Sequence, residues 1–201
     1  KSDTYEVGLK RNTKKQNLAT SLFFSKYKDF IEAYAPTGAP STFQSQNATD
    51  AEIWGAELNS TYYLKEERFG TSFNTTLAYT KGDNLTENQP LTTIQPFDAK
   101  FSIRYNTEDD SWLHILTANY VGEPRVKSGT DTFIPDSYFT FDFSTRYKYS
   151  DSLELTAGVY NLLDETYYNY QSVQGLETNL ENLTKYSQPG RSLKLGFNWK
   201  F

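Results

Sequence analysis

The sequence predicts an all-β protein, an antiparallel transmembrane β-barrel of which this chain forms about nine strands. Three observations favour this fold: strict apolar–polar alternation in Ser192–Phe201, connections that alternate between short and long, and aromatic residues at predicted strand ends. Successive side chains of a strand point to opposite faces, so alternation gives one apolar and one polar face. Membrane-spanning barrels have short turns at one end, longer loops at the other and aromatic girdles at both interfaces.

Composition narrows the function classes. The 201 residues carry a net charge of -5 and no cysteine, which argues against a nucleic-acid partner and excludes disulfides, thiolate metal sites and a cysteine nucleophile. Mean hydropathy is -0.69 although 16% of residues are aromatic, and no apolar run is long enough for a transmembrane helix. A barrel with apolar residues at every second position fits this composition. A soluble tyrosine-rich β protein would fit it equally well.

The first half of the chain predicts four strands. They are expected at Tyr5–Lys10, Asn17–Ile31, Ile53–Leu64 and Ser72–Thr80. The facing of the second strand is ambiguous because Phe23 and Phe24 are adjacent. Residues 32–50 are rich in Ser, Thr and Gln, contain two Pro and one Gly, and are predicted to form a long loop. The other two connections between these strands are short and polar.

The second half predicts five more strands. They are expected at Ala99–Tyr105, Trp112–Val121, Phe139–Tyr149, Leu153–Tyr160 and Ser192–Phe201. Leu113 and Ile115 interrupt the alternation of the sixth strand. Long loops are predicted at residues 81–95, 122–137 and 169–191, whereas the connections between them are short, as in a membrane barrel.

Aromatic and charged residues occupy different positions in these strands. The aromatic residues near predicted strand ends are Trp54, Tyr62, Tyr63, Tyr79, Tyr105, Trp112, Tyr120, Phe139, Tyr147, Tyr149 and Trp199. They predict two interfacial girdles, although each could also be a cross-strand packing partner. The charged residues that fall on the polar face are Lys100, Arg104, Asp142, Arg146, Lys148, Glu154 and Lys194. On a lipid-facing surface, a Lys or Arg at mid-depth would cost about 2–4 kcal/mol.

The last ten residues resemble the terminal strand of a bacterial outer-membrane barrel. The resemblance includes the sorting pattern formed by Lys194, Gly196, Trp199 and Phe201. It implies a location in the bacterial cell outer membrane, with membrane lipid and the barrel-assembly machinery as partners. The alternative is an edge strand of a soluble sandwich.

The predicted number of strands indicates a larger barrel. Bacterial single-chain barrels have an even number of strands, whereas nine are predicted here. An open first edge would leave unpaired backbone groups in lipid. We therefore expect residues 1–201 to be the C-terminal part of a longer chain.

Two motifs resemble the TonB-dependent outer-membrane receptors. One is Asn161–Tyr168 (N-L-L-D-E-T-Y-Y) and the other is Pro189–Leu193 (P-G-R-S-L). The residues that carry the family signature are Asn161, Leu162, Asp164, Tyr167, Tyr168, Pro189, Gly190 and Arg191. Lys1–Lys10 and Ala51–Leu58 also resemble strands of this family. The resemblance implies about the last nine strands of a barrel of 22, with the earlier strands and the N-terminal plug absent from this chain.

The resemblance also implies a function, which is active import of an iron-containing ligand driven through TonB. Ile134–Asp142 and Ala157–Asp164 are most similar to the haem and haemoglobin receptors. Haem or a ferric siderophore would be the transported ligand, and the haem-ligating residues would lie upstream of Lys1. The residues in or near the predicted loops that could contact ligand are Tyr34, Phe43, Tyr168, Tyr170 and Gln171. Ordinary loop packing is the alternative role for each of them.

Other functions remain open at this point. A siderophore importer of the same family is the nearest alternative, followed by a self-contained small barrel acting as an enzyme or a porin. We expect no enzyme, because no nucleophile–base pair is evident, and no metal site or cofactor in this segment. The single histidine, His114, lies near the start of a strand on the side of the short turns, far from the predicted ligand loops.

Overall fold

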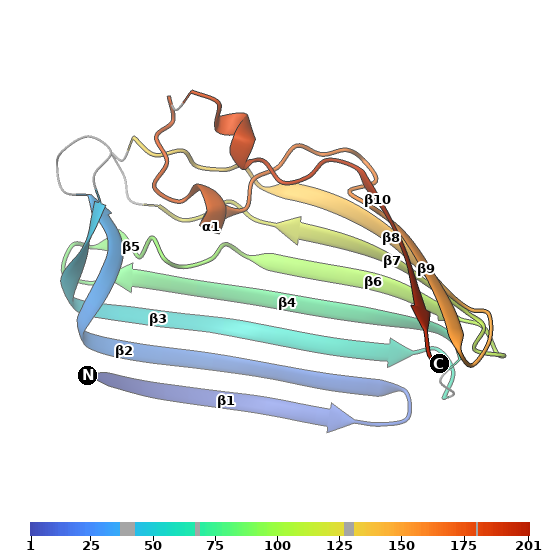
Figure 1. The fold of residues 1–201 in the computed structure, drawn as a ribbon. Helices are drawn as coiled ribbons and strands as arrows, with labels where there is room; N and C mark the ends of the chain where they lie inside the picture. The colour runs from blue at the N-terminus through green and yellow to red at the C-terminus, as the bar shows by residue number, and fades with distance from the viewer. Residues whose placement is uncertain (37–42, 67–68, 127–130, 180) are drawn as a thin grey trace.

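The computed structural model describes residues 1–36, 43–66, 69–126, 131–179 and 181–201, with the backbone alone at 32–36, 43–44 and 46–49. Within them, one antiparallel sheet runs in chain order from β1 to β10 (Figure 1). Its long strands are β1 (Ser2–Asn12), β2 (Gln16–Pro36), β3 (Phe43–Tyr63), β4 (Gly70–Asn84), β6 (Asp98–Asn106), β7 (Trp112–Val121), β8 (Tyr138–Lys148), β9 (Leu153–Tyr160) and β10 (Ser192–Trp199). A two-residue strand, β5 (Gln89–Pro90), pairs only with β4.

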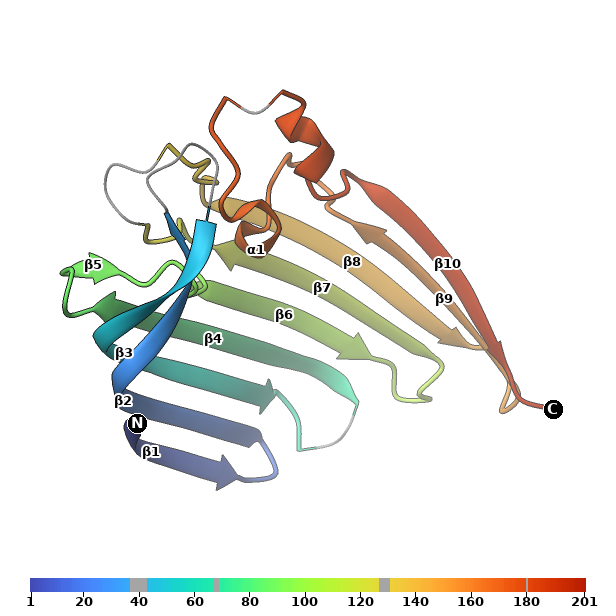
Figure 2. The ribbon, with the colours of Figure 1, turned by 60° about the vertical axis from the view of Figure 1, so that its left-hand side comes forward.

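The sheet is curved like a trough, and its two ends differ (Figure 2). The turn end carries the four short connections, at residues 13–15, 64–69, 107–111 and 149–152. The loop end carries the longer connections, with the helices α1 (Tyr170–Val173) and η1 (Leu183–Tyr186). The predicted alternation of short and long connections is confirmed from β4 onward, whereas only residues 37–42 separate β2 from β3.

The structure corrects the predicted loop bounds. The predicted loop 32–50 is wrong where β2 continues to Pro36 and β3 begins at Phe43. The predicted loop 81–95 contains the end of β4 and all of β5. In both places the backbone pairing continues although the sequence no longer alternates between apolar and polar residues. The predicted loop 169–191 includes two short helices, and the last strand ends at Trp199 rather than Phe201.

The register resolves the ambiguous facing of β2. Phe24 pairs with Tyr5 of β1 and Trp54 of β3, which places it on the apolar, convex face. Phe23 therefore points to the concave face and lies across Gly55, where an added Cβ would be 2.5 Å from the Phe23 ring. A bulkier residue than glycine would not fit beneath this ring.

The convex face is an exposed apolar surface. Leu195 is 75% exposed and Phe197 is 74% exposed, although both belong to a regular strand. The buried hydrophobic residues among those described are few: Ala51, Leu91, Leu113, Tyr170 and Val173. Soluble monomers rarely expose a whole strand face of large apolar side chains, so the alternation fits contact with hydrocarbon. None of the described helices is long and apolar enough to cross a membrane.

Aromatic side chains border this apolar surface at both ends. At the loop end, a row crosses β3–β8 with successive ring centroids 4.7 to 6.4 Å apart, formed by Trp54, Tyr79, Phe97, Tyr120 and Phe139. At the turn end, Trp112 and Tyr147 stack at 4.4 Å. Two girdles are therefore present, as predicted. Tyr63 is an exception, because its register places it on the concave face beside Ser72.

Candidate functional site

Asn161 closes the base of the last long loop. Its backbone is left-handed (φ 52°), a conformation that asparagine tolerates better than most residues. Its side-chain oxygen accepts from the Glu165 backbone N–H at 2.9 Å, and its amide nitrogen donates to the Glu165 and Pro189 carbonyls. Its own backbone N–H donates to Asp142 at 2.8 Å. Asn161 thus joins the end of β9 to β8 and to the segment entering β10.

Asp164 forms the second half of this connection. Its side-chain oxygen accepts from the Arg191 backbone N–H at 2.7 Å, and the Arg191 guanidinium lies 3.8 Å from the other oxygen. A Cβ at Gly190 would lie 2.8 Å from the same carboxylate, so glycine allows this close approach. We call Asn161, Asp164 and Arg191 the loop clamp. The two sequence motifs therefore form one structural unit, which fixes where the loop leaves and re-enters the sheet.

The last loop packs against the connection that contains β5. Tyr170 and Val173 of α1 are buried, as is Leu91 from the other connection. The Tyr170 hydroxyl and the Gln174 side-chain amide both donate to the Thr92 carbonyl at 2.7 Å. Burial raises the pKa of Tyr170 to about 12, so this hydroxyl stays protonated and able to donate.

A third connection joins the same assembly. The Phe133 backbone N–H donates to the Leu176 carbonyl at 2.7 Å, and Thr132 forms a bridge with Glu177. The Phe133 ring meets Tyr168 edge-on at 5.1 Å. We call residues 85–97, 131–137 and 162–191 the loop cluster. Three segments far apart in the sequence are thereby held together at the loop end.

The structure places the predicted ligand contacts in two groups. Tyr168, Tyr170 and Gln171 lie together in the last loop, and Gln171 is exposed whereas Tyr170 is buried with its hydroxyl engaged. Tyr34 lies in β2 and Phe43 begins β3, but their side chains lie outside the described residues. Contact with ligand therefore stays a prediction for these residues. The sequence did not indicate the contacts of Thr92 and Gln174, because a backbone carbonyl acceptor and a side-chain amide in a loop form no recognisable motif.

The terminal strand has the predicted facing. Lys194 lies on the concave face, with its ammonium 4.8 Å from the Tyr160 ring centroid. A Cβ at Gly196 would be 2.8 Å from the Thr156 hydroxyl. Trp199 is 65% exposed beyond the apolar run, and Phe201 is fully exposed after the strand ends. Its role in sorting stays a prediction.

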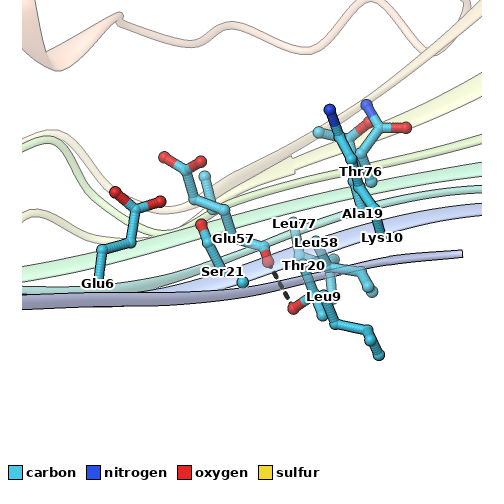
Figure 3. Close-up of a pocket in the computed structure, with 13 residues that line it drawn as sticks. Glu6, Leu9, Lys10, Ala19, Thr20, Ser21, Glu57, Leu58, Thr76 and Leu77 are labelled. Atoms are coloured by element: carbon cyan, nitrogen blue, oxygen red, sulfur yellow. Dashed lines mark hydrogen bonds between the residues drawn. The ribbon is translucent and has the colours of Figure 1, made fainter.

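The concave face is polar and hollowed. Figure 3 shows a depression of about 680 Å³ whose lining includes Glu6 and Glu57, both pointing to the concave side. A second hollow, of about 620 Å³, lies near the turn end and is lined by Arg104 and Arg146. Arg104 and Arg146, which were predicted to lie on the polar face, thus line the concave surface.

His114 lies on the convex face, close to the turn end. Its ring stacks beside Trp112 at 5.5 Å, and its Nδ1 lies 2.9 Å from the Thr145 hydroxyl. Within the described residues, no cluster of three His, Cys, Asp or Glu side chains could hold a metal. The histidine thus belongs to the aromatic girdle and is remote from the loop cluster.

Residues 1–162 match the family model described as TonB dependent receptor-like, beta-barrel. The chain is 26% identical along its whole length to hemoglobin-haptoglobin utilization protein B of Neisseria meningitidis serogroup C, and 27% identical over 92% of its length to hemoglobin-binding protein A of Haemophilus influenzae. It spans 30% of the first relative and 22% of the second.

Solved structures have the same fold. The copper transporter OprC superposes on the whole chain with a TM-score of 0.84 at 24% identity, and the ferric enterobactin receptor PfeA of Pseudomonas aeruginosa with 0.75 at 21% identity. The chain covers 30% and 31% of these two proteins. With the family match over residues 1–162, the chain belongs to the TonB-dependent receptor β-barrels of the bacterial outer membrane.

Proposed function

We propose that residues 1–201 are the C-terminal portion of a receptor that imports an iron-containing ligand, of haem or haemoglobin type, driven through TonB. The observation that carries this proposal is the match along the whole chain to hemoglobin-haptoglobin utilization protein B. The missing strands and the plug would come from the same receptor, and the barrel-assembly machinery would insert it. A ferric siderophore is the second candidate ligand, consistent with the fold shared with the enterobactin receptor.

The geometry supports different roles for the two faces of the sheet and for its loop end. The convex face contacts lipid, the concave face forms an inner wall, and the loop cluster lies at the end that would face the outside. The loop clamp holds the last loop at its two ends, so Tyr168 and Gln171 are presented on a fixed support. A preorganised loop lowers the entropic cost of binding a large ligand.

The test uses the full-length receptor in an iron-starved Gram-negative host that cannot make haem and lacks its own haem receptors. We expect growth on haemoglobin when the receptor and TonB are both present, and no growth when either is deleted. In a matched iron-starved host that makes its own haem, growth on ferric siderophores but not on haemoglobin would assign the siderophore instead. Uptake that persists without TonB would contradict active import and indicate a passive pore.

A further inference from the structure

The connection between β1 and β2 concentrates positive charge at the turn end. Residues 10–15 (K-R-N-T-K-K) contain four cations and no carboxylate, and all six residues are exposed. Lys14 lies 3.6 Å from Glu66, but the two side chains are 80% and 55% exposed, so water screens this pair. Among the described residues, no carboxylate pairs with Arg11 or Lys15. The positive charge of this turn is therefore largely uncompensated.

Hydrogen bonds fix the backbone that carries these cations. The Thr13 backbone N–H donates to the Gln16 carbonyl at 2.8 Å, and the Gln16 backbone N–H donates to the Thr13 hydroxyl at 2.9 Å. The Lys15 carbonyl accepts from the Tyr63 backbone N–H at 2.8 Å, which ties the turn to β3. Lys14 and Lys15 therefore project from a backbone of defined geometry.

Arg11 and Lys10 leave β1 on opposite faces. Tyr5 and Leu9 are 69% and 58% exposed on the convex face, and Arg11 is the next position with the same facing. It pairs with Leu18 of β2. Lys10 instead lines the concave depression (Figure 3). Arg11 thus stands where the apolar surface ends, at the border between hydrocarbon and the lipid headgroups on the side of the short turns.

We propose that Arg11, Lys14 and Lys15, which we call the basic turn, bind the phosphate of an anionic phospholipid in the periplasmic leaflet. A guanidinium pairs with two phosphate oxygens through parallel hydrogen bonds, and the two ammonium groups add attraction between opposite charges. The acyl chains of this lipid would continue along the exposed convex face beside Leu9. The inference needs only the outer-membrane barrel and holds for any imported ligand.

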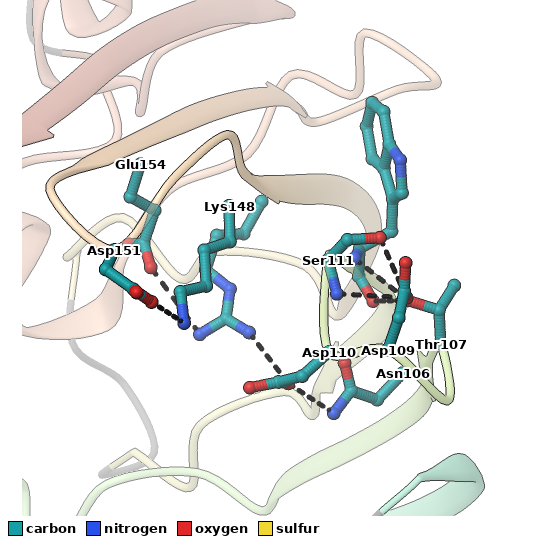
Figure 4. A network of polar contacts seen from close by, with 10 residues as sticks. Asn106, Thr107, Asp109, Asp110, Ser111, Lys148, Asp151 and Glu154 are labelled. Atoms are coloured by element: carbon teal, nitrogen blue, oxygen red, sulfur yellow. Dashed lines mark hydrogen bonds and ion pairs between the residues drawn. The ribbon is translucent and has the colours of Figure 1, made fainter.

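The facing of Arg11 identifies a lipid as the occupant. A soluble polyanion could reach Lys14 and Lys15, but a group that pairs with Arg11 lies against the lipid-facing surface of the sheet. The other short turns lack this charge. Residues 64–69 carry two cations and two carboxylates, residues 107–111 carry three carboxylates and no cation, and residues 149–152 carry one carboxylate (Figure 4). Selection of an anionic lipid is therefore expected at one part of the rim only.

Photolabelling of the intact full-length receptor tests the proposal. The receptor is reconstituted in phosphatidylcholine bilayers that contain a small fraction of phosphatidylglycerol with a photoreactive group near its headgroup, and labelled peptides are identified by mass spectrometry. We expect residues 5–18 to be labelled more strongly than by the same fraction of a phosphatidylcholine probe, and unlabelled phosphatidylglycerol to compete. Competition by inorganic phosphate at constant ionic strength would overturn the assignment to a lipid, because a free anion would then suffice.

Substitutions test the role of the cations. One cation near an anionic membrane surface strengthens association about fivefold, so Arg11→Gln should lower the labelling by about this factor, and combining it with Lys14→Gln and Lys15→Gln should abolish the preference for phosphatidylglycerol. Lys10→Gln is the matched control, because it removes the same charge from the adjacent residue on the concave face, and should leave the labelling unchanged.

Two results would overturn the inference. One is equal labelling of residues 5–18 by the two lipid probes, and the other is undiminished labelling in Arg11→Gln. Haemoglobin-dependent growth of cells carrying the same variants measures the proposed function independently, so failure of the lipid site and failure of ligand import are distinguishable.

Discussion

At the scale of single residues, a left-handed asparagine can serve two different purposes. Asn161 and Asn182 both have positive φ angles, of 52° and 64°. Asn161 uses its side chain for three hydrogen bonds in the loop clamp, whereas Asn182 caps η1 without a side-chain hydrogen bond. Backbone conformation alone therefore does not explain Asn161.

The pair provides a matched comparison in the full-length receptor. Both Asn161→Gly and Asn182→Gly keep the left-handed backbone accessible, but only the first removes hydrogen bonds. We expect Asn161→Gly to destabilise the last loop by about 1–3 kcal/mol, because the buried Asn161 amide loses its three hydrogen bonds to the Glu165 and Pro189 backbone. Hydrogen exchange of residues 162–191 measures this. Equal exchange in the two variants would show that the clamp contributes nothing.

Asp109 shows how the same kind of local bonding organises a turn. Its carboxylate accepts from the Thr107 hydroxyl at 2.6 Å and from the hydroxyl and backbone N–H of Ser111 (Figure 4). These hydrogen bonds lower the pKa of Asp109 to about 2. The carboxylate therefore remains ionised at ordinary pH, and its bonds hold the short connection between β6 and β7.

At the scale of elements, the terminal strand separates assembly from ligand binding. Trp199 and Phe201 are exposed aromatic residues at the turn end, far along β10 from the loop cluster. Replacing Phe201 by Ser, or deleting it, should lower the amount of receptor in the outer membrane several-fold without altering ligand affinity per inserted molecule, because the barrel wall is otherwise unchanged.

The measurement is surface labelling of intact cells combined with ligand binding normalised to receptor amount. Asn198→Ser is the control, since Asn198 belongs to the same strand but lies on its polar face. Normal surface levels of the Phe201 variants would contradict the sorting role.

The elements also show what sequence can reveal. The strands were predictable because lipid on one side imposes alternation, as in β8 and β10. Pro36 and Phe43 could not be assigned to strands, because the sequence around them lacks apolar–polar alternation although β2 and β3 pair there. In the site, Asn161 and Asp164 were visible as a motif, but their bonds to Pro189 and Arg191 depend on the closure of a long loop.

At the scale of the whole molecule, the sheet is open. Within the described residues, β1 pairs only with β2 and β10 only with β9. The outer edges of β1 and β10 therefore carry backbone N–H and C=O groups without partners in the sheet, and such edges are not tolerated in hydrocarbon. In the proposed receptor, further strands would lie between β10 and β1 and close the barrel.

This openness predicts the behaviour of residues 1–201 expressed alone. We expect them to aggregate or to be degraded rather than to insert, whereas the full-length receptor should migrate in gels with the heat-dependent shift of a closed barrel. Gel mobility with and without boiling distinguishes these outcomes. A heat-dependent shift of the 201-residue chain would show that it closes by itself, and the assignment to a larger barrel would fail.

The hydrogen bonds from Tyr170 and Gln174 to the Thr92 carbonyl connect positions about eighty residues apart. Chimeric receptors that exchange the last loop alone would therefore place it against a foreign neighbour with different packing. A chimera that exchanges residues 85–97 and 131–137 together with the last loop would transfer the complete loop cluster. In evolution, these segments are expected to diversify as one module rather than as independent appendages.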